Sequence, residues 1–179
     1  MRPSLTVVVP IHNEAGFLPG ALPRLLAVLD GVDADADVIL AENGSTDETA
    51  AVAGRLAAAD IRVTVLRLPT PDYGAAMREG FLAARGELIA NGDIDYFSGD
   101  FLTAALALAG EADVVLASKR APGAVDRRGP LRRLGTLTFN VLLRLLLRSR
   151  VSDTHGMKVI RRTVVASIAP RVFSTKDLF

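Results

Sequence analysis

The segment Leu5–Pro10 has the sequence LTVVVP, in which apolar residues follow one another without regular polar alternation. This pattern is typical of a β-strand that is covered on both faces. Further runs rich in Val, Ile and Leu follow at Asp37–Glu42, Ile61–Leu68, Glu87–Asn91 and Asp113–Ala117. Helical segments are expected between the runs, at Leu18–Leu29, Thr46–Ala59, Tyr73–Arg85 and Gly99–Ala109. Strands and helices that alternate at this spacing predict an α/β fold with a mostly parallel sheet, flanked by helices and built with right-handed crossovers.

Length and composition exclude several classes of protein. The chain has 179 residues, which suits a single domain. It contains no cysteine, which excludes thiolate metal ligands, thiol nucleophiles and disulfides. Twenty-one Lys and Arg balance twenty Asp and Glu, for a formal charge of +1. This balance is unlike the strongly basic field of a nucleic-acid binder, so no nucleic-acid partner is expected.

Charge and hydropathy vary along the chain. Residues 119–150 hold nine Lys or Arg against one Asp, which favours an anionic partner. The most apolar segment, Leu134–Leu147, is fourteen residues long and contains Arg144. A membrane-spanning helix needs about 20 apolar residues, so none is expected. The N-terminus enters a predicted strand almost at once, so no signal peptide is expected. These features predict a cytoplasmic protein, soluble or peripheral on the cytoplasmic face of the membrane.

Local features predict several element boundaries. Ser45 and Glu48 have the spacing of a capping box, with Ser45 as the N-cap residue of a helix. Gly86 is expected in the left-handed conformation at a helix C-terminus. Pro19 and Pro23 are hard to combine in one regular helix, so the first helix is expected to become regular near Pro23.

Polar residues follow three of the predicted strands. The first strand leads into Pro10–Glu14, the second into Glu42–Asp47 and the fourth into Asn91–Asp95. Any one cluster could be an ordinary turn, because Asn, Asp and Gly are common turn residues. Ligands of open parallel sheets bind outside the carboxyl ends of the strands. Three polar clusters at that edge therefore favour a binding site over three unrelated turns.

The pair Asp93 and Asp95 suggests a metal site. Two carboxylates at positions i and i+2 after a strand can point the same way. Mg²⁺ or Mn²⁺ typically takes one or two carboxylates and completes its shell with water and substrate phosphates. The alternative is a solvated acidic loop that caps the helix near Gly99, since Asp-x-Asp alone is a weak motif.

Longer motifs extend the argument to most of the chain. They are VVVPIHNE at Val7–Glu14, ENGSTDET at Glu42–Thr49, YGAAMREGFLAARGE at Tyr73–Glu87, NGDIDY at Asn91–Tyr96, ASKRAPG at Ala117–Gly123 and SDTHGMKVIRR at Ser152–Arg162. In this order they resemble the family 2 glycosyltransferases of GT-A fold, and most closely the dolichol- or polyprenyl-phosphate mannose and glucose synthases. The resemblance implies a Rossmann-like sheet within one catalytic domain over residues 1–179.

The resemblance also implies the roles of particular residues in a metal-dependent, inverting hexosyltransferase with a UDP- or GDP-linked sugar as donor. Contacts to the nucleotide sugar fall on Pro10, His12, Glu14, Glu42, Asn43 and Asp93. The Mg²⁺ or Mn²⁺ ligands fall on Asp93 and Asp95, and the catalytic residues on Asp95 and Asp153. Cations for an acceptor phosphate fall on Lys119 and Arg133.

The chain departs from the family pattern in three places. The family usually has an aromatic residue at His12 and paired aspartates at Glu42 and Asn43, which leaves the preferred nucleobase open. Phe97 stands where relatives often carry a polar metal ligand. The segment Asp153–Gly156 is one residue shorter than the common form.

Two acceptors are compatible with these residues. A hydroxyl needs a general base, for which Asp153 is the candidate. A phosphate monoester is already anionic near neutral pH and needs cations to position it. The chain offers Lys119, Arg120, Arg127, Arg128, Arg132 and Arg133 for that role. A solvated basic surface is the alternative for this cluster.

A predicted basic amphipathic helix at Leu131–Arg148 bears on the acceptor. Its Arg133, Asn140, Arg144 and Arg148 share one stripe, and most other positions are apolar. Such a helix either packs in the core or lies at a membrane interface. Beside a site for a lipid phosphate, the interfacial interpretation gains weight, so a polyprenyl phosphate is the preferred acceptor. A hydroxyl acceptor, or a sugar-nucleotide-binding domain without turnover, remains the alternative. Family members usually continue beyond the position of Phe179, so a truncated form is expected.

Overall fold

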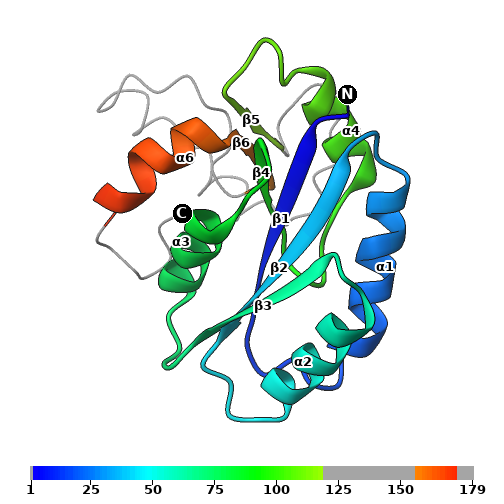
Figure 1. Cartoon of the computed structure of the whole chain (residues 1–179), viewed down its shortest axis with the longest axis vertical. Coiled ribbons are helices and arrows are strands. Elements are labelled where there is room, and N and C mark those ends of the chain that lie inside the picture. Colours follow the sequence, from blue (N-terminus) through cyan, green and yellow to red (C-terminus); the bar gives the residue numbers. More distant parts are fainter. Residues whose placement is uncertain (1, 119–155, 173–179) are drawn as a thin grey trace, which may run out of the picture. The chain divides into compact units, whose positions relative to one another are not determined.

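The computed structural model describes residues 2–118 and 156–172 of the chain. The described strands form one sheet in the order β3-β2-β1-β4-β6-β5 (Figure 1). The strands are β1 (Ser4–Ile11), β2 (Asp35–Asn43), β3 (Val63–Leu68), β4 (Leu88–Asn91), β5 (Val114–Leu116) and β6 (Lys158–Arg161). The helices are α1 (Leu18–Asp30), α2 (Thr49–Ala59), α3 (Tyr73–Ala83), α4 (Gly99–Ala107) and α6 (Arg162–Ile168), followed by the 3₁₀ helix η1 (Ala169–Arg171).

The sheet is mostly parallel, as the apolar runs predicted. Strand β1 pairs in parallel with both β2 and β4, and β2 pairs in parallel with β3. Strand β6 pairs with β4 in the antiparallel direction, through the register Ile89 to Ile160. Strand β6 was not expected from the sequence, because its four residues carry too little pattern to be recognised.

Helices cover both faces of the sheet, which explains the unbroken apolar strands. On one face, Val8, Ile39 and Ile89 pack in a buried cluster with Met77 and Phe81 of α3. Val165 of α6 and Ala169 of η1 complete the cluster. The neighbouring strand residues point to the other face and are buried as well, among them Val7, Val9, Val38 and Leu40. Helices α1 and α2 lie on that second face (Figure 1).

Helix α1 begins at Leu18, so the expected late start near Pro23 is wrong. Pro19 lies in the first turn, where a backbone N–H has no helical partner in any case. Pro23 lies inside the helix and is exposed, so it removes one hydrogen bond without disturbing the buried side. That side carries Leu18, Leu22, Leu25 and Leu29, each at most 2% exposed. Their burial outweighs the lost hydrogen bond.

The predicted capping box and the predicted left-handed Gly86 are also wrong. Helix α2 begins at Thr49, three residues after the expected start, and its N-cap residue Glu48 makes no side-chain cap. Among the described residues, positive φ angles occur at Asn13 (56°) and Gly44 (60°), and not at Gly86. Gly86 is needed for close packing instead, because a Cβ there would lie 2.6 Å from the backbone nitrogen of Thr6.

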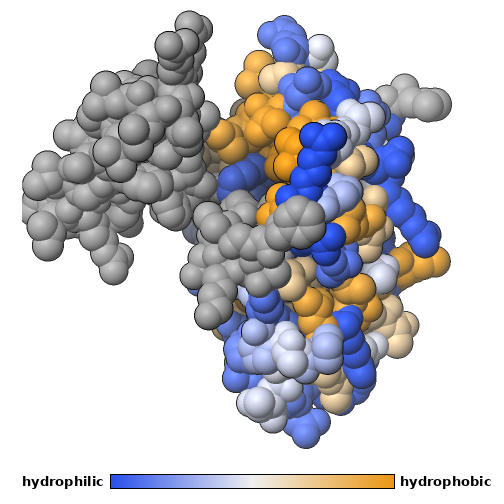
Figure 2. Space-filling model, turned by 90° about the vertical axis from the view of Figure 1, so that its left-hand side faces the viewer, coloured by the Kyte–Doolittle hydropathy of each residue, from blue (hydrophilic) through white to orange (hydrophobic). Residues whose placement is uncertain are grey.

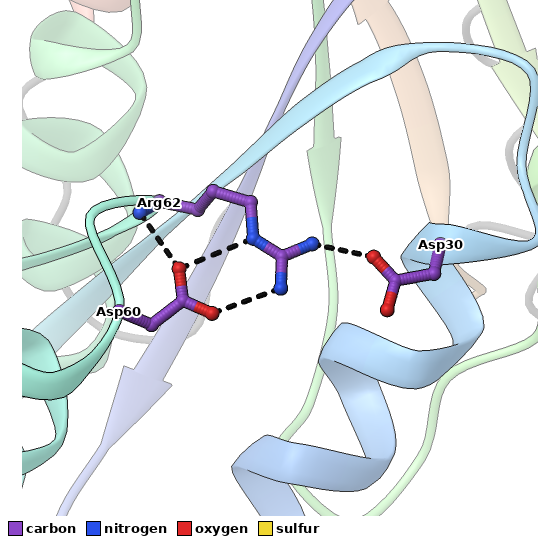
Figure 3. Close-up of polar contacts among 3 residues, drawn as sticks. All are labelled: Asp30, Asp60 and Arg62. Carbon is purple, nitrogen blue, oxygen red and sulfur yellow. Dashed lines mark hydrogen bonds and ion pairs between the residues drawn. The ribbon is translucent and has the colours of Figure 1, made fainter.

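An ion-pair network lies at the edge where the strands begin. The guanidinium of Arg62 donates to Asp60 Oδ2 at 2.8 Å and to Asp30 Oδ1 at 2.6 Å (Figure 3). The hydrogen bond from Arg62 lowers the pKa of the Asp60 carboxyl below its ordinary value. The same bond raises the pKa of Arg62. The network ties the end of α1 to the loop that precedes β3.

The chain divides into two units, Met1–Val115 with Lys158–Phe179, and Leu116–Met157. In the second unit, the described part includes a backbone hydrogen bond from Ala117 N to Met157 O at 2.8 Å. The predicted helix at 131–148 lies outside the described residues. Within the described part, no helix is both long and apolar enough to cross a membrane. Figure 2 shows apolar and polar side chains intermingled on one face of the molecule.

Candidate active site

The ends of β1, β2 and β4 bring most of the predicted site residues to one edge of the sheet. Strand β1 lies between β2 and β4. After β1 the chain adds β2 and then β3 on one side, and α3 then carries it back to β4 on the other side of β1. This reversal of strand order is where open α/β sheets bind ligands. The residues at this edge are Pro10, His12 and Glu14 from β1 and its loop, Glu42 and Asn43 from β2, and Asp93 and Asp95 after β4.

The loop after β1 and the loop after β2 are hydrogen-bonded to each other. The register of the two strands places Ile11 beside Glu42, so the loops leave the sheet at the same level. His12 Nδ1 lies 2.8 Å from the backbone oxygen of Asn43. Asn13 N donates to Ser45 Oγ at 3.0 Å. Ser45 thus supports the neighbouring loop, which explains why it does not cap α2 as predicted.

Glu42 is a buried carboxylate at this edge, only 4% exposed. Its Oε1 accepts a hydrogen bond from Ser45 N at 2.6 Å. The acidic side chain to which the family resemblance assigns a nucleotide contact is therefore held in place by its own loop. A buried carboxylate fixed by a backbone N–H costs little reorganisation when a ligand binds.

Asn43 joins a third loop to the site. Asn43 is 6% exposed, and its Oδ1 accepts a hydrogen bond from Asp72 N at 2.6 Å. Asp72 in turn caps α3, since its Oδ1 accepts from Ala75 N at 2.9 Å. Next to Asn43, Gly44 has φ 60° and passes so close that a Cβ would lie 2.6 Å from the carbonyl carbon of Thr70. The loop between β3 and α3 is thus fixed against the end of β2.

Thr49 and Asp47 hold the backbone at Glu14. The hydroxyl of Thr49 is fully buried and accepts from Glu14 N at 2.7 Å. The same hydroxyl donates to Asp47 Oδ1, which also accepts from Thr49 N at 2.9 Å. Asp47 Oδ2 accepts from Ala15 N at 3.3 Å. The hydrogen bond from the Thr49 hydroxyl lowers the pKa of Asp47, so this carboxylate keeps its negative charge in the fold.

Asp93 and Asp95 lie on a tight turn after β4 rather than on an extended strand. Tyr96 N donates to Asp93 O at 3.0 Å, and Gly92 N donates to Val8 O at 3.0 Å, which fixes the turn to β1. Ile94 is buried between the two exposed aspartates. Tyr73 OH donates to Asp93 Oδ1 at 3.4 Å.

These two aspartates fit a hard divalent cation by their chemistry. They supply exposed carboxylate oxygens, the donors that Mg²⁺ and Mn²⁺ prefer. The cap of α4 is Ser98, whose Oγ accepts from Phe101 N at 3.2 Å, so the aspartates are not needed for capping. Over residues 2–118 and 156–172, no three acidic or histidine side chains gather into a complete metal cage. The pair therefore suits a cation whose shell is completed by a ligand's phosphates.

Several residues of this edge support the site, although none of them was assigned a role there from the sequence. They are Asn13, Thr49, Asp72, Tyr73 and Asn91. Asn91 Oδ1 accepts from Lys158 N at 2.6 Å and so ties the end of β4 to the start of β6. Each has a partner remote in sequence, and the sequence offers only a weak signal, the position of each polar residue at a strand end or at the start of a helix. The predicted residues Lys119, Arg120, Arg133 and Asp153 lie outside the described residues.

Comparison with known proteins agrees with this arrangement. The family model described as "Glycosyl transferase family 2" matches residues 6–168. An uncharacterized glycosyltransferase of Mycobacterium tuberculosis is 34% identical over 167 residues, which cover 92% of this chain and 71% of the relative. An undecaprenyl-phosphate 4-deoxy-4-formamido-L-arabinose transferase of Sodalis glossinidius is 32% identical over 93 residues, or 51% of this chain and 28% of the relative.

A solved structure shares the fold. It is the mannosyltransferase PcManGT from Pyrobaculum calidifontis in complex with GDP-Man and Mn²⁺. The TM-score is 0.62 at 21% identity, and the match covers 94% of this chain. The chain spans about half the length of that protein, 47% of it. The GT-A architecture expected from the sequence is thereby confirmed, and with a family match over nearly its whole length the chain belongs to glycosyl transferase family 2.

Proposed function

We propose that the chain transfers a hexose from a UDP- or GDP-linked sugar to a polyprenyl phosphate, with inversion at the sugar carbon. The observation that carries this proposal is the convergence of three strand-end loops at one edge of the sheet. One loop presents the exposed Asp93 and Asp95, and the other two are locked together around the buried Glu42. Such an edge offers separate places for a diphosphate and for a nucleoside.

The relatives support both halves of the proposal. The Sodalis glossinidius relative is named as an undecaprenyl-phosphate transferase. The Pyrobaculum calidifontis structure contains GDP-Man and Mn²⁺. By analogy, the donor of this chain is a nucleotide diphosphate sugar and the acceptor is a polyprenyl phosphate.

In this proposal the site residues within the described part of the chain bind either the nucleoside or the metal. Glu14 and Glu42 contact the nucleoside half of the donor, and Pro10, His12 and Asn43 shape the surface beneath it. Asp93 and Asp95 hold Mg²⁺ or Mn²⁺, which when bound neutralises the diphosphate of the donor and of the departing nucleotide. Because the two aspartates are exposed, a cation can reach their carboxylate oxygens from solvent together with a ligand.

The acceptor side rests on residues outside the described part of the chain. A phosphate monoester is an anion near neutral pH, so it needs positioning cations more than a base. We assign that role to Lys119, Arg120 and Arg133, and we place Asp153 near the reacting carbon. The amphipathic segment 131–148 gives reversible contact with the cytoplasmic face of a membrane in this proposal.

A donor screen by thermal unfolding in Mn²⁺ tests the donor half. A ligand at 100 times its Kd adds about 2.7 kcal/mol of stability. Transfer of labelled sugar to a short-chain polyprenyl phosphate, compared with a panel of simple sugars, tests the acceptor half. A chain that binds no nucleotide sugar, or that glycosylates sugars but never the lipid phosphate, contradicts the proposal.

Two variants separate the acceptors. For a phosphate acceptor, Arg133→Ala should raise the acceptor KM, because loss of one charge-assisted contact costs on the order of 1.5–3 kcal/mol. Asp153→Asn should then do moderate damage without removing a basic limb from the pH–rate profile. For a hydroxyl acceptor the pattern reverses, because removal of a general base typically costs ~10²–10⁴ in rate.

A further inference from the structure

The backbone of Asn13 has a conformation that L-residues seldom adopt. Its φ is 56°, in the left-handed region, immediately after β1. Asparagine tolerates this region better than other residues with a side chain, because its short amide can bond locally. A residue held in this region next to a ligand site points to a constraint set by function.

The polar groups of Asn13 make a set of contacts that joins two loops. The backbone N–H donates to Ser45 Oγ at 3.0 Å. The side-chain Oδ1 accepts from Thr46 N at 2.9 Å and from Thr46 Oγ1 at 3.3 Å. The side-chain Nδ2 lies 3.2 Å from His12 Nε2. The amide thus has its oxygen on the β2 loop and its nitrogen on the imidazole of its own loop.

Two backbone groups determine the proton positions along this chain of contacts. The Thr46 backbone N–H can only donate, so the atom of the Asn13 amide that faces it is the oxygen. The amide NH₂ is therefore left to donate to His12 Nε2, which must carry no proton. At the other end the Asn43 carbonyl can only accept, so His12 Nδ1, 2.8 Å away, carries the proton. Both ends require the same neutral tautomer of His12.

We propose that Asn13 is a positioning residue for the nucleotide half of the donor. It holds the loops after β1 and β2 in register and fixes His12 as the Nδ1–H tautomer. Both ring nitrogens of His12 are then occupied inside the protein, so the ring offers a bound nucleoside its exposed face and not a hydrogen-bonding edge. The nature of the ligand rests on the proposed function, whereas the tautomer of His12 does not.

Asn13→Gly tests the side chain of Asn13 without disturbing the backbone, because glycine adopts a positive φ without strain. It removes the bonds to Thr46 and His12 while leaving the backbone N–H for Ser45. We expect the Kd of free UDP or GDP, whichever the wild type prefers, to rise about tenfold, equivalent to about 1.4 kcal/mol. At saturating donor, kcat should stay within about twofold, since the loss falls on binding rather than on a group that is used only in the transition state. Thr64→Ala, on the exposed side of β3, is the control for surface substitution.

Nitrogen-15 NMR of the imidazoles supplies a readout that loss of stability alone would not change. The chain has two histidines, so His155→Gln assigns the signals of His12. Wild-type His12 should show a protonated Nδ1 and an unprotonated Nε2, and Asn13→Gly should show averaging between the two tautomers. A wild-type His12 protonated at Nε2 contradicts the proposal without any variant. A fixed tautomer in Asn13→Gly, or a nucleotide Kd within about twofold of wild type, also contradicts it. If the wild type binds neither UDP nor GDP, the proposed function fails. The tautomers of His12 are measured without ligand, so they still show whether Asn13 fixes the imidazole.

Discussion

Asp72 N donates to the side-chain oxygen of Asn43 at 2.6 Å, so the loop before α3 is tied to the end of β2. The bond is inside the fold, since Asn43 is 6% exposed. The chain therefore uses the buried Asn43 amide oxygen to hold the loop that precedes α3. That position is a structural support for the site as well as a candidate contact for the donor.

Asn43→Ala should destabilise the fold by about 1–3 kcal/mol, because the N–H of Asp72 loses its buried acceptor. Asn43→Asp retains an acceptor oxygen and should recover most of the loss. Urea unfolding of the three proteins measures the difference. Equal losses for the two variants would show that the hydrogen bond is not the source of the stability.

Asp95→Ala should abolish the Mn²⁺-dependent part of donor binding and leave the unfolding temperature nearly unchanged. The side chain is exposed on a turn, and exposed carboxylates seldom carry stability. Calorimetric titration of the donor with and without Mn²⁺ measures the effect. Asp33→Ala is the matched control, since Asp33 is an exposed carboxylate paired with Arg2 at the opposite edge. Donor affinity in Mn²⁺ equal to wild type would rule out Asp95 as a metal ligand.

Asp47→Asn should lower stability at neutral pH and have less effect in acid. The pKa of Asp47 is lowered in the fold by the Thr49 hydroxyl, so its charged form stabilises the native state. That contribution is present above the ordinary carboxyl pKa of 3.8 and disappears as the pH falls through the lower pKa of the folded protein. The free energy of unfolding, measured against pH for both proteins, should show two curves that converge in acid. Parallel curves would exclude a role for this titration.

Arg62→Ala should lower the unfolding temperature at low ionic strength and leave donor binding unchanged. Arg62 bridges Asp30 and Asp60 at the edge far from the strand-end loops (Figure 3). All three groups are partly exposed, so salt should weaken the network. At about 1 M salt, where the Debye length is about 3 Å, the difference between variant and wild type should shrink. A difference independent of salt would indicate that packing of the Arg62 stem matters more than its charge.

The sheet could be predicted from the sequence because its strands are covered on both faces. LTVVVP and the four later apolar runs each coincide with a strand of the structure to within two residues at either end. Strand β6 could not be predicted in the same way. Its four residues acquire a partner only when the chain returns to β4, which no local pattern records.

The predictions that are wrong share one physical cause, which is competition from contacts remote in sequence. Ser45 has the spacing of a helix cap, yet its hydroxyl accepts a hydrogen bond from Asn13 N on another loop. Pro23 argues against a helix, yet buried leucines on the opposite side maintain it. The strand-end carboxylates were predictable as a group, because parallel strands end at one edge. Their supports, such as Thr49 beneath Glu14, depend on how two loops meet and so were not.

The place of β6 between β4 and β5 has a consequence for biosynthesis. Asn91, at the end of β4, and Lys158, at the start of β6, are 67 residues apart. At about 5–20 residues per second, a ribosome needs roughly 3–13 s to make that stretch. Until then the nascent chain can pair β4 with β1, but the edge of β4 that faces away from β1 has no partner. Strand β5 also lacks its neighbour, because β6 lies between β4 and β5. An open strand edge can pair with other chains. The nascent protein is therefore exposed to aggregation through β4 for those seconds.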